Sequence, residues 1–168
     1  MKTTTDRTGS AVVELPSDHE IRITRKFNAP ADLVFEVWTT PEHVRNWWGF
    51  PDHPVVTCEI DLRVGGEWRY VVNHPQSGEI AWSGTYLEID RPHRLVSREV
   101  FEPYPESETT NYMTLTDVDG VTTMDVLVVH PNRESRDGHI GSGMERGMQV
   151  SLNRIDEILA ALQEGHDS

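Results

Sequence analysis

Three carboxylates near the middle of the chain are the residues best suited, by type and spacing, to acid–base chemistry. Glu59 and Asp61 alternate along "CEIDLRV", and Glu67 opens the next run, "EWRY". A carboxylate that faces a cavity can act as a general base. Neighbouring strand residues point to opposite faces, and a one-residue change of register exchanges the faces. The free energy needed to bury a charge favours the outward orientation of all three side chains, whereas the opposite register would support catalysis.

Nucleophilic, metal and cofactor chemistry receive little support. Cys58 is the only cysteine and alternates onto one face with Ile60 and Leu62, so we expect a buried and inert thiol. Ser142 stands in "GSGME", which lacks the GxSxG pattern of a nucleophile elbow. The eight histidines contain no HxH pattern and no pair four residues apart. The "GGEW" turn lacks the lysine of a phosphate-binding loop. We therefore predict no catalytic residue, no metal and no cofactor.

Large aromatic and methionine side chains are the remaining candidates for function, because they can bind apolar molecules. Rigid rings would give a pocket its shape and methionines an adaptable wall, but the same residues could instead fill a core. The candidate cavity-lining residues are Trp38, Trp47, Trp48, Trp68, Tyr70, Trp82, Tyr86, Met113, Met124, Met144 and Met148. A polar contact from Tyr70, Tyr86 or Arg98 would orient a ligand.

The first fifty residues predict two strands followed by two short helices. "AVVEL" and "EIRITRKF" alternate as strands do, and Ile21, Ile23 and Arg25 share one face of the second. In "PADLVFEVW" the apolar residues recur at helical spacing, and Pro30 fits the first turn of that helix. Thr40-Pro41 has the composition of the cap and first residue of a second, shorter helix.

Residues 55–130 predict an antiparallel meander of about six strands. Turn sequences such as "VGGE", "HPQSGE" and "DVDG" separate the strand-like runs. Alternation places Trp68 with Tyr70 on one face, and it places Trp82, Gly84 and Tyr86 together on the neighbouring run. A glycine in mid-strand is compatible with a bend that curves the sheet around a void.

A long final helix is predicted from about residue 138 to residue 162, with Asp137 as its N-cap and Gly165 as its stop. Its apolar stripe comprises Ile140, Met144, Met148, Leu152, Ile155, Leu159 and Leu162. Gly143 and Gly147 weaken its first half by roughly 1 kcal/mol each relative to alanine. These glycines permit either close packing on the sheet or a softer wall beside a cavity mouth.

Length and charge bound the class of protein. The 168 residues are expected to form one domain, 10–163, between a flexible N-terminal tail, 1–9, and a C-terminal tail, 164–168. The net charge of −13 and the absence of a basic patch disfavour nucleic acid as a partner. No run reaches the ~20 apolar residues of a membrane span, and no apolar leader is visible, so we expect a cytoplasmic protein without membrane insertion. An exposed strand edge would allow a homodimer.

Four strings carry a resemblance to a known family. They are "LPSDHEIRITRKFNAP" (15–30), "LVFEVWTTPEHVRNWWG" (33–49), "CEIDLRVGGEWRY" (58–70) and "SGMERGMQVSLNRIDEIL" (142–159). In order and spacing the chain resembles the activator of Hsp90 ATPase-like family, of the SRPBCC, START-like or birch-pollen-allergen-like superfamily. The resemblance implies an α+β helix-grip fold: a curved antiparallel sheet around a long C-terminal helix, with two short helices after the first strand and a cavity that opens towards them.

The resemblance also frames three hypotheses about function, because members of the superfamily bind lipids, sterols and polyketides and a minority catalyse cyclisation or hydrolysis. The leading hypothesis is non-enzymatic binding of a hydrophobic small molecule, such as a lipid, a polyketide or an aromatic compound, between the sheet and the C-terminal helix. The first alternative is a protein-interaction module of the Hsp90 ATPase activator type, with the acidic "FEPYPESE" loop at its surface. The second is a cyclase or hydrolase that uses a cavity carboxylate.

Overall fold

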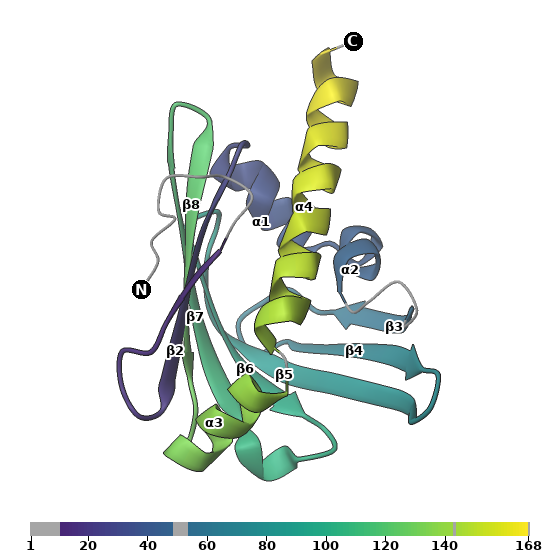
Figure 1. Ribbon diagram of the computed structural model, residues 1–168. Helices are drawn as coiled ribbons and strands as arrows, with labels where there is room; N and C mark the ends of the chain where they lie inside the picture. Colours follow the sequence, from purple (N-terminus) through teal and green to yellow (C-terminus); the bar gives the residue numbers. More distant parts are fainter. Residues whose placement is uncertain (1–10, 49–53, 143, 168) are drawn as a thin grey trace.

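A curved antiparallel sheet wraps around a long C-terminal helix, as Figure 1 shows. The computed structural model describes residues 11–48, 54–142 and 144–167. The eight strands of these residues hydrogen-bond in the order β1-β2-β8-β7-β6-β5-β4-β3. The fold is therefore the α+β helix-grip arrangement that the sequence predicts. The predicted N-terminal tail lies outside the described residues, and the domain boundaries stay a prediction.

The order of the strands and of the first two helices follows the predicted one, with six strands between residues 55 and 130. The strands are β1 (Val12–Glu14), β2 (Glu20–Phe27), β3 (Val55–Ile60), β4 (Glu67–His74), β5 (Gly78–Asp90), β6 (Arg94–Phe101), β7 (Thr109–Val118) and β8 (Val121–Val129). The helices are α1 (Ala31–Thr39), α2 (Pro41–Trp47), α3 (Arg133–Gly141) and α4 (Met144–Asp167), with a 3-10 turn η1 (Pro105–Ser107).

The alternation predicted for the second strand is confirmed in β2. Ile21, Ile23 and Arg25 are buried, and Arg22 between them is exposed. β2 pairs along its whole length with β8, so that Ile23 stands opposite Val126. This pairing brings the second strand of the chain beside its last strand, and their buried residues face α4 and the core.

Helices α1 and α2 form close to where the sequence predicts them. Val34 and Val37 of α1 are fully buried, as their helical spacing indicates. Thr40 is the N-cap of α2 and Pro41 its first residue, as predicted. Pro30 precedes α1 as its N-cap rather than lying inside its first turn, because its ψ of 157° is extended. The second helix packs against both β3 and α4.

The predicted start of the final helix is wrong, because the segment forms two helices. The first, α3, begins at Arg133, five residues before the predicted start, since Asn132 supplies its cap. The Asn132 side chain accepts a hydrogen bond from the backbone N–H of Ser135 at 2.8 Å. Asp137, the predicted cap, lies inside α3. Figure 1 shows α3 and α4 set at an angle to each other, and Gly143, which the sequence places at their junction, lies outside the described residues.

The second of these helices, α4, carries the predicted apolar stripe. Leu152, Ile155 and Leu159 are buried, whereas Ile140, predicted to share the stripe, is exposed on α3. The helix continues through Gly165 to Asp167, because one interior glycine lowers helix stability without forcing the chain out of the helix. No helix within the described ranges combines the length and the hydropathy needed to cross a membrane.

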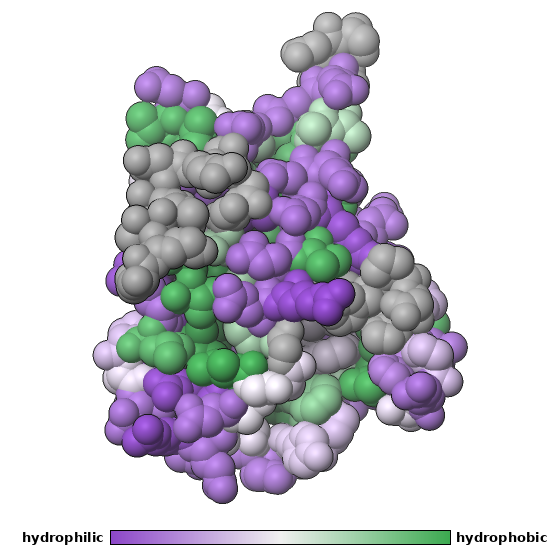
Figure 2. All heavy atoms as spheres, in the orientation of Figure 1, coloured by the Kyte–Doolittle hydropathy of each residue, from purple (hydrophilic) through white to green (hydrophobic). Residues whose placement is uncertain are grey.

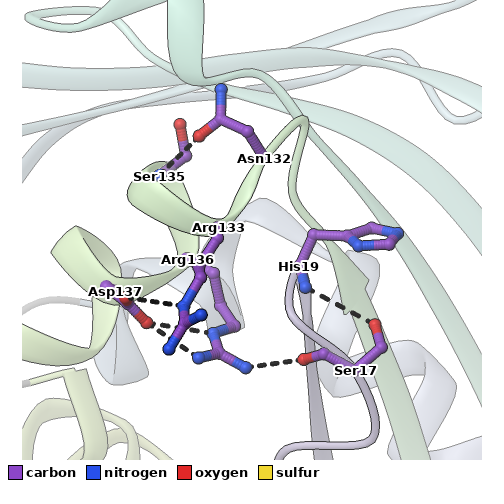
Figure 3. A network of polar contacts seen from close by, with 7 residues as sticks. All are labelled: Ser17, His19, Asn132, Arg133, Ser135, Arg136 and Asp137. Atoms are coloured by element: carbon purple, nitrogen blue, oxygen red, sulfur yellow. Dashed lines mark hydrogen bonds and ion pairs between the residues drawn. The ribbon is translucent and has the colours of Figure 1, made fainter.

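A polar network ties α3 to the loop between β1 and β2 (Figure 3). The buried guanidinium of Arg136 donates from Nη1 to the backbone oxygen of Ser17 at 2.6 Å and from Nη2 to Asp137 Oδ1 at 2.8 Å. Its hydrogen bond lowers the pKa of Asp137. The start of the C-terminal segment is therefore fastened to the N-terminal hairpin.

The middle of α4 is anchored to β2 by a buried ion pair. The Arg25 side chain is fully buried, and its Nη2 donates to Asp156 Oδ2 while its Nη1 donates to Asn153 Oδ1 at 3.3 Å. The guanidinium carbon also lies 4.9 Å from the ring centroid of Phe27. Burial lowers the pKa of Arg25, and the charge of Asp156 offsets part of that effect. An ion pair therefore contributes to the attachment of α4 to the sheet.

Candidate functional site

A cavity of about 480 Å³ lies between the concave face of the sheet and α4. Apolar residues of β2 and β8, among them Ile23, Val126 and Val128, line its sheet side. Figure 2 shows one face of the molecule, on which the outer side of α4 is hydrophilic and apolar side chains gather beside it over the sheet. Helix α4 therefore has hydrophilic side chains on its outer side and apolar side chains on the side that faces the cavity.

A chain of aromatic rings forms the wall near α1 and α2. The ring centroids of Trp47 and Trp48 are 5.7 Å apart, those of Trp48 and Trp82 are 5.4 Å apart, and those of Trp82 and Phe101 are 5.5 Å apart. Trp38 joins this row, with its centroid 4.8 Å from that of Trp47. Trp47 Nε1 donates to the backbone oxygen of Val37 at 3.0 Å, which fixes the orientation of its ring.

The opposite wall comes from the first half of α4. Met144, Gly147, Met148 and Ser151 line the cavity, and Leu152 follows them. Gly147 is thus one of the residues of α4 that line the cavity. The interpretation of the glycine-containing half as a permissive wall stays a prediction, and Gly143 lies outside the described residues.

The structure places all eleven candidate residues around two neighbouring cavities. The larger cavity is lined by Trp38, Trp47, Trp48, Trp82, Met124, Met144 and Met148. A smaller one, of about 90 Å³, is lined by the same first three tryptophans together with Trp68, Tyr70, Tyr86 and Met113. Tertiary structure therefore brings together residues from seven elements. Contact of these side chains with a ligand stays a prediction.

Tyr70 and Tyr86, which line the smaller cavity, and Cys58, which stands opposite Tyr70 in the pairing of β3 with β4, are neutral at pH 7. Burial raises the pKa values of Tyr70 and Tyr86. Burial also raises the pKa of the Cys58 thiol to about 11, so the thiol is protonated at neutral pH, which agrees with the predicted inert cysteine. The indole Nε1 of Trp68 is buried and has no hydrogen-bond partner among the described residues. These residues offer phenol and indole groups to the smaller cavity.

Glu99 of β6 is the functional candidate that sequence reasoning missed. It lines both cavities, whereas Glu59, Asp61 and Glu67 are exposed on the outer face, as the favoured register predicts. Asn111 of β7 donates from Nδ2 to Glu99 Oε1 at 2.9 Å. Burial raises the pKa of Glu99, and the hydrogen bond from Asn111 offsets part of that rise. The site therefore contains one half-buried carboxyl group that lines both cavities.

Side-chain alternation along β6 is the only sequence pattern that could indicate that Glu99 faces the cavity, and this pattern is ambiguous. Leu95, Glu99 and Phe101 lie on the cavity side, whereas Arg98 is exposed. The prediction that Arg98 orients a ligand is therefore wrong, because the Arg98 side chain is exposed and lines neither cavity. Both sets of alternating residues in "RLVSREVF" mix apolar with charged side chains, so periodicity alone does not choose between them.

A histidine pair closes the cavity near α3. His139 lines the cavity, and its Nδ1 lies 3.0 Å from Nε2 of His130. Burial lowers the pKa of His139, and burial, His139 and Arg136 lower the pKa of His130 to about 4. Both rings are therefore neutral at pH 7. Among the described residues, no group of three or more His, Cys, Asp or Glu side chains is placed to hold a metal ion.

We expect Glu99→Gln to stabilise the protein increasingly as the pH rises. Folding raises the pKa of Glu99, so the carboxyl contributes stability below its ordinary pKa of 4.5 and loses that contribution as the pH rises through the raised value. Glutamine keeps an acceptor for Asn111 without a buried charge. Urea unfolding of both proteins between about pH 4 and about pH 8 measures the difference in free energy of unfolding.

The matched control is Glu102→Gln, one residue beyond the end of the same strand. A hydrogen bond from Arg69 lowers the pKa of Glu102. Loss of the Glu102 carboxylate should therefore lower the free energy of unfolding at neutral pH, whereas Glu99→Gln should raise it. A Glu99→Gln effect that stays constant with pH, or that follows the sign of Glu102→Gln, contradicts a buried carboxyl at position 99.

The fold and the cavity together define the class of protein: a helix-grip domain with a large apolar cavity between its sheet and its C-terminal helix. The family model described as "Activator of Hsp90 ATPase homolog 1-like protein" matches residues 28–160. The chain belongs to this family, whose fold is known to bind small molecules or proteins. No curated protein shows significant similarity to the chain.

Solved structures share the fold at low sequence identity. A protein from Rhodobacter sphaeroides is 24% identical, with a TM-score of 0.85 over 90% of this chain and 99% of that one. The protein Ms6760 from Mycobacterium smegmatis is 25% identical, with a TM-score of 0.79 over 89% and 96% of the two chains. DynU16, from the dynemicin biosynthetic locus, is 22% identical, with a TM-score of 0.65; the alignment covers 86% of this chain and 48% of DynU16.

Proposed function

We propose that the protein binds a hydrophobic small molecule in the cavity between its sheet and α4, without transforming it. The observation that carries this proposal is the cavity of about 480 Å³ lined by mostly apolar side chains. Ligand sites commonly measure roughly 300 to 1,000 Å³ and combine apolar walls with a few polar groups. Glu99 and Asn111 supply such polar groups on the sheet side.

Burial of apolar ligand surface would provide the affinity. At about 25 cal/mol per Å², a ligand that buries roughly 300 Å² of apolar surface gains roughly 7 kcal/mol before the loss of its own freedom is subtracted. The tryptophan row is rigid, because Trp47 is hydrogen-bonded to α1 and its neighbours pack against it. Little further ordering would therefore accompany binding.

Native mass spectrometry of the protein purified from its own host tests the proposal directly. We expect an added small mass that disappears on denaturation. A thermal-shift screen with lipids, polyketides and aromatic compounds provides the second measurement. Protein that carries no added mass and responds to none of these compounds would count against ligand binding.

The variant Gly147→Leu tests the place of binding. Leucine at this position of α4 would extend into the cavity, so we expect at least a tenfold loss of affinity for any compound found in the screen, which corresponds to about 1.4 kcal/mol. The matched control is Gly141→Leu, because an added Cβ at Gly141 of α3 meets open space and this residue does not line the cavity. Equal affinities of the two variants would place binding elsewhere.

A protein-interaction role of the Hsp90 ATPase activator type is the second candidate, supported by the family match. The predicted acidic loop also has a feature suited to it, since Tyr104 is 61% exposed between acidic residues. Stimulation of the ATPase of an Hsp90 from the same host would support this role, and Tyr104→Ser should then reduce it. Absence of binding and of stimulation would remove it.

The catalytic alternative now depends on one residue. Glu99 is the inward carboxyl group that a cyclase or hydrolase of this fold would need, and its raised pKa suits a general acid. Recovery of a bound compound unchanged after long incubation would favour binding alone. A cytoplasmic location and a homodimer remain predictions, to be checked by fractionation and by sedimentation.

A further inference from the structure

The polar groups at the sheet side of the cavity face it mainly as hydrogen-bond acceptors. Asn111 uses its amide nitrogen on Glu99 Oε1, at 2.9 Å. Its amide oxygen, Oδ1, is buried and has no hydrogen-bond partner among the described residues. A buried acceptor without a partner carries a free-energy penalty that a donor from a ligand would remove. The second carboxyl oxygen of Glu99 adds a further acceptor beside it.

The cavity supplies no cation to balance this carboxyl group. Among the described residues that line either cavity, none is lysine or arginine. The other titratable groups in the walls are His74, His139, Tyr70 and Tyr86. His139 has a lowered pKa and both tyrosines have raised ones, so these three are neutral at pH 7. A positively charged ligand group would therefore meet an acid that has no lysine or arginine beside it among the described residues that line the cavities.

Aromatic rings line the same cavity as this carboxyl group. Phe101 lies two residues from Glu99 on the same face of β6, and it is in contact with Trp82, which in turn contacts Trp48. The negative faces of such rings attract ammonium groups, most strongly where water is excluded. The same rings provide the large apolar surface that the body of a ligand would bury.

We propose that the cavity binds an amine: a protonated primary or secondary ammonium group attached to an aromatic or aliphatic body. The ammonium group donates to Glu99 and to Asn111 Oδ1, and the body lies against the tryptophan row and the methionines of α4. This inference rests on the proposed ligand-binding function and specifies the chemistry of the ligand. A carboxylate or phosphate ligand would bring its charge against Glu99, and a neutral alcohol would satisfy only one of the two acceptors.

Three probes with one ring system and different charges test this inference. They are 1-naphthylmethylamine, 1-naphthylmethanol and 1-naphthoate, titrated into the intact protein at neutral pH by isothermal titration calorimetry. We expect the amine to bind at least about tenfold more tightly than the alcohol, since hydrogen bonds to charged groups contribute about 1.5 to 3 kcal/mol. We expect the carboxylate to bind most weakly.

The variant Glu99→Gln assigns the preference to the proposed residue. We expect it to lower the affinity for the amine at least about tenfold and to leave the affinity for the alcohol within about twofold. The charge series on the unaltered protein does not depend on how well this variant folds. Equal binding of amine and alcohol overturns the amine inference but leaves apolar ligand binding standing, whereas absence of binding by all three probes overturns both.

Discussion

Replacing Gly84 by alanine is expected to destabilise the protein by more than about 3 kcal/mol, because the sheet has no room for a Cβ atom at this position. A Cβ built on Gly84 would lie 2.8 Å from the carbonyl carbon of Arg98 and closer still to its oxygen. It would also lie 2.8 Å from Cε2 of Trp68. The first obstacle is backbone of the neighbouring strand, so no side-chain rotation relieves it.

The expected damage extends to the candidate site. Gly84 stands opposite Trp68 in the pairing of β4 with β5, and β5 pairs irregularly with β6 just beyond it. Separation of β5 from β6 would move Trp82 and Glu99 relative to each other, so ligand affinity should fall together with stability. Chemical denaturation with circular dichroism measures the loss in free energy of unfolding.

The same substitution at Gly138 provides the control. An added Cβ there meets nothing within 4 Å, and Gly138 lies in helix α3, so alanine should be neutral or stabilise by up to about 1 kcal/mol. If Gly84→Ala lowered the free energy of unfolding no more than Gly138→Ala does, this result would contradict the close approach of β5 to the backbone of Arg98.

Removing the partner of the buried Arg25 should have the second large effect. Asp156→Ala is expected to lower the free energy of unfolding by about 2 to 4 kcal/mol, since a guanidinium with no exposed surface loses its counter-charge. The Asp156 side chain is itself 34% exposed, and Asn153 remains as a neutral partner, so the loss should not reach the upper end of the range for buried pairs. Urea unfolding near pH 7 measures it.

A double variant distinguishes an unpaired buried charge from a simple loss of contact. Arg25→Met removes the charge and keeps most of the side-chain volume, so Arg25→Met with Asp156→Ala should be more stable than Asp156→Ala alone. Asp125→Ala removes the partner of the exposed Arg22 on the same strand and should cost less than about 1 kcal/mol. Additive losses in the double variant would contradict the account of a buried ionic anchor.

Local periodicity was sufficient for most of the architecture. Two-residue alternation in "EIRITRKF" predicts the buried face of β2. Helical spacing predicts the burial of Val34 and Val37 in α1 and of Leu152, Ile155 and Leu159 in α4. These features depend on neighbours a few residues apart, which sequence contains directly. The start of α3 was mispredicted because both Asn132 and Asp137 have suitable side chains, and only the observed bond to Ser135 distinguishes the actual cap.

The sequence by itself determined the helix-grip family, the order of the strands and the place of the first two helices. Only the tertiary structure decided that a cavity of about 480 Å³ remains between sheet and helix and that Glu99, with Asn111, faces it. The physical reason is that side-chain alternation is a local property of one strand. A cavity remains where the curved sheet and the anchored helix α4 do not pack fully against each other. Its presence therefore depends on residues far apart in the sequence, and no local pattern along the chain indicates it.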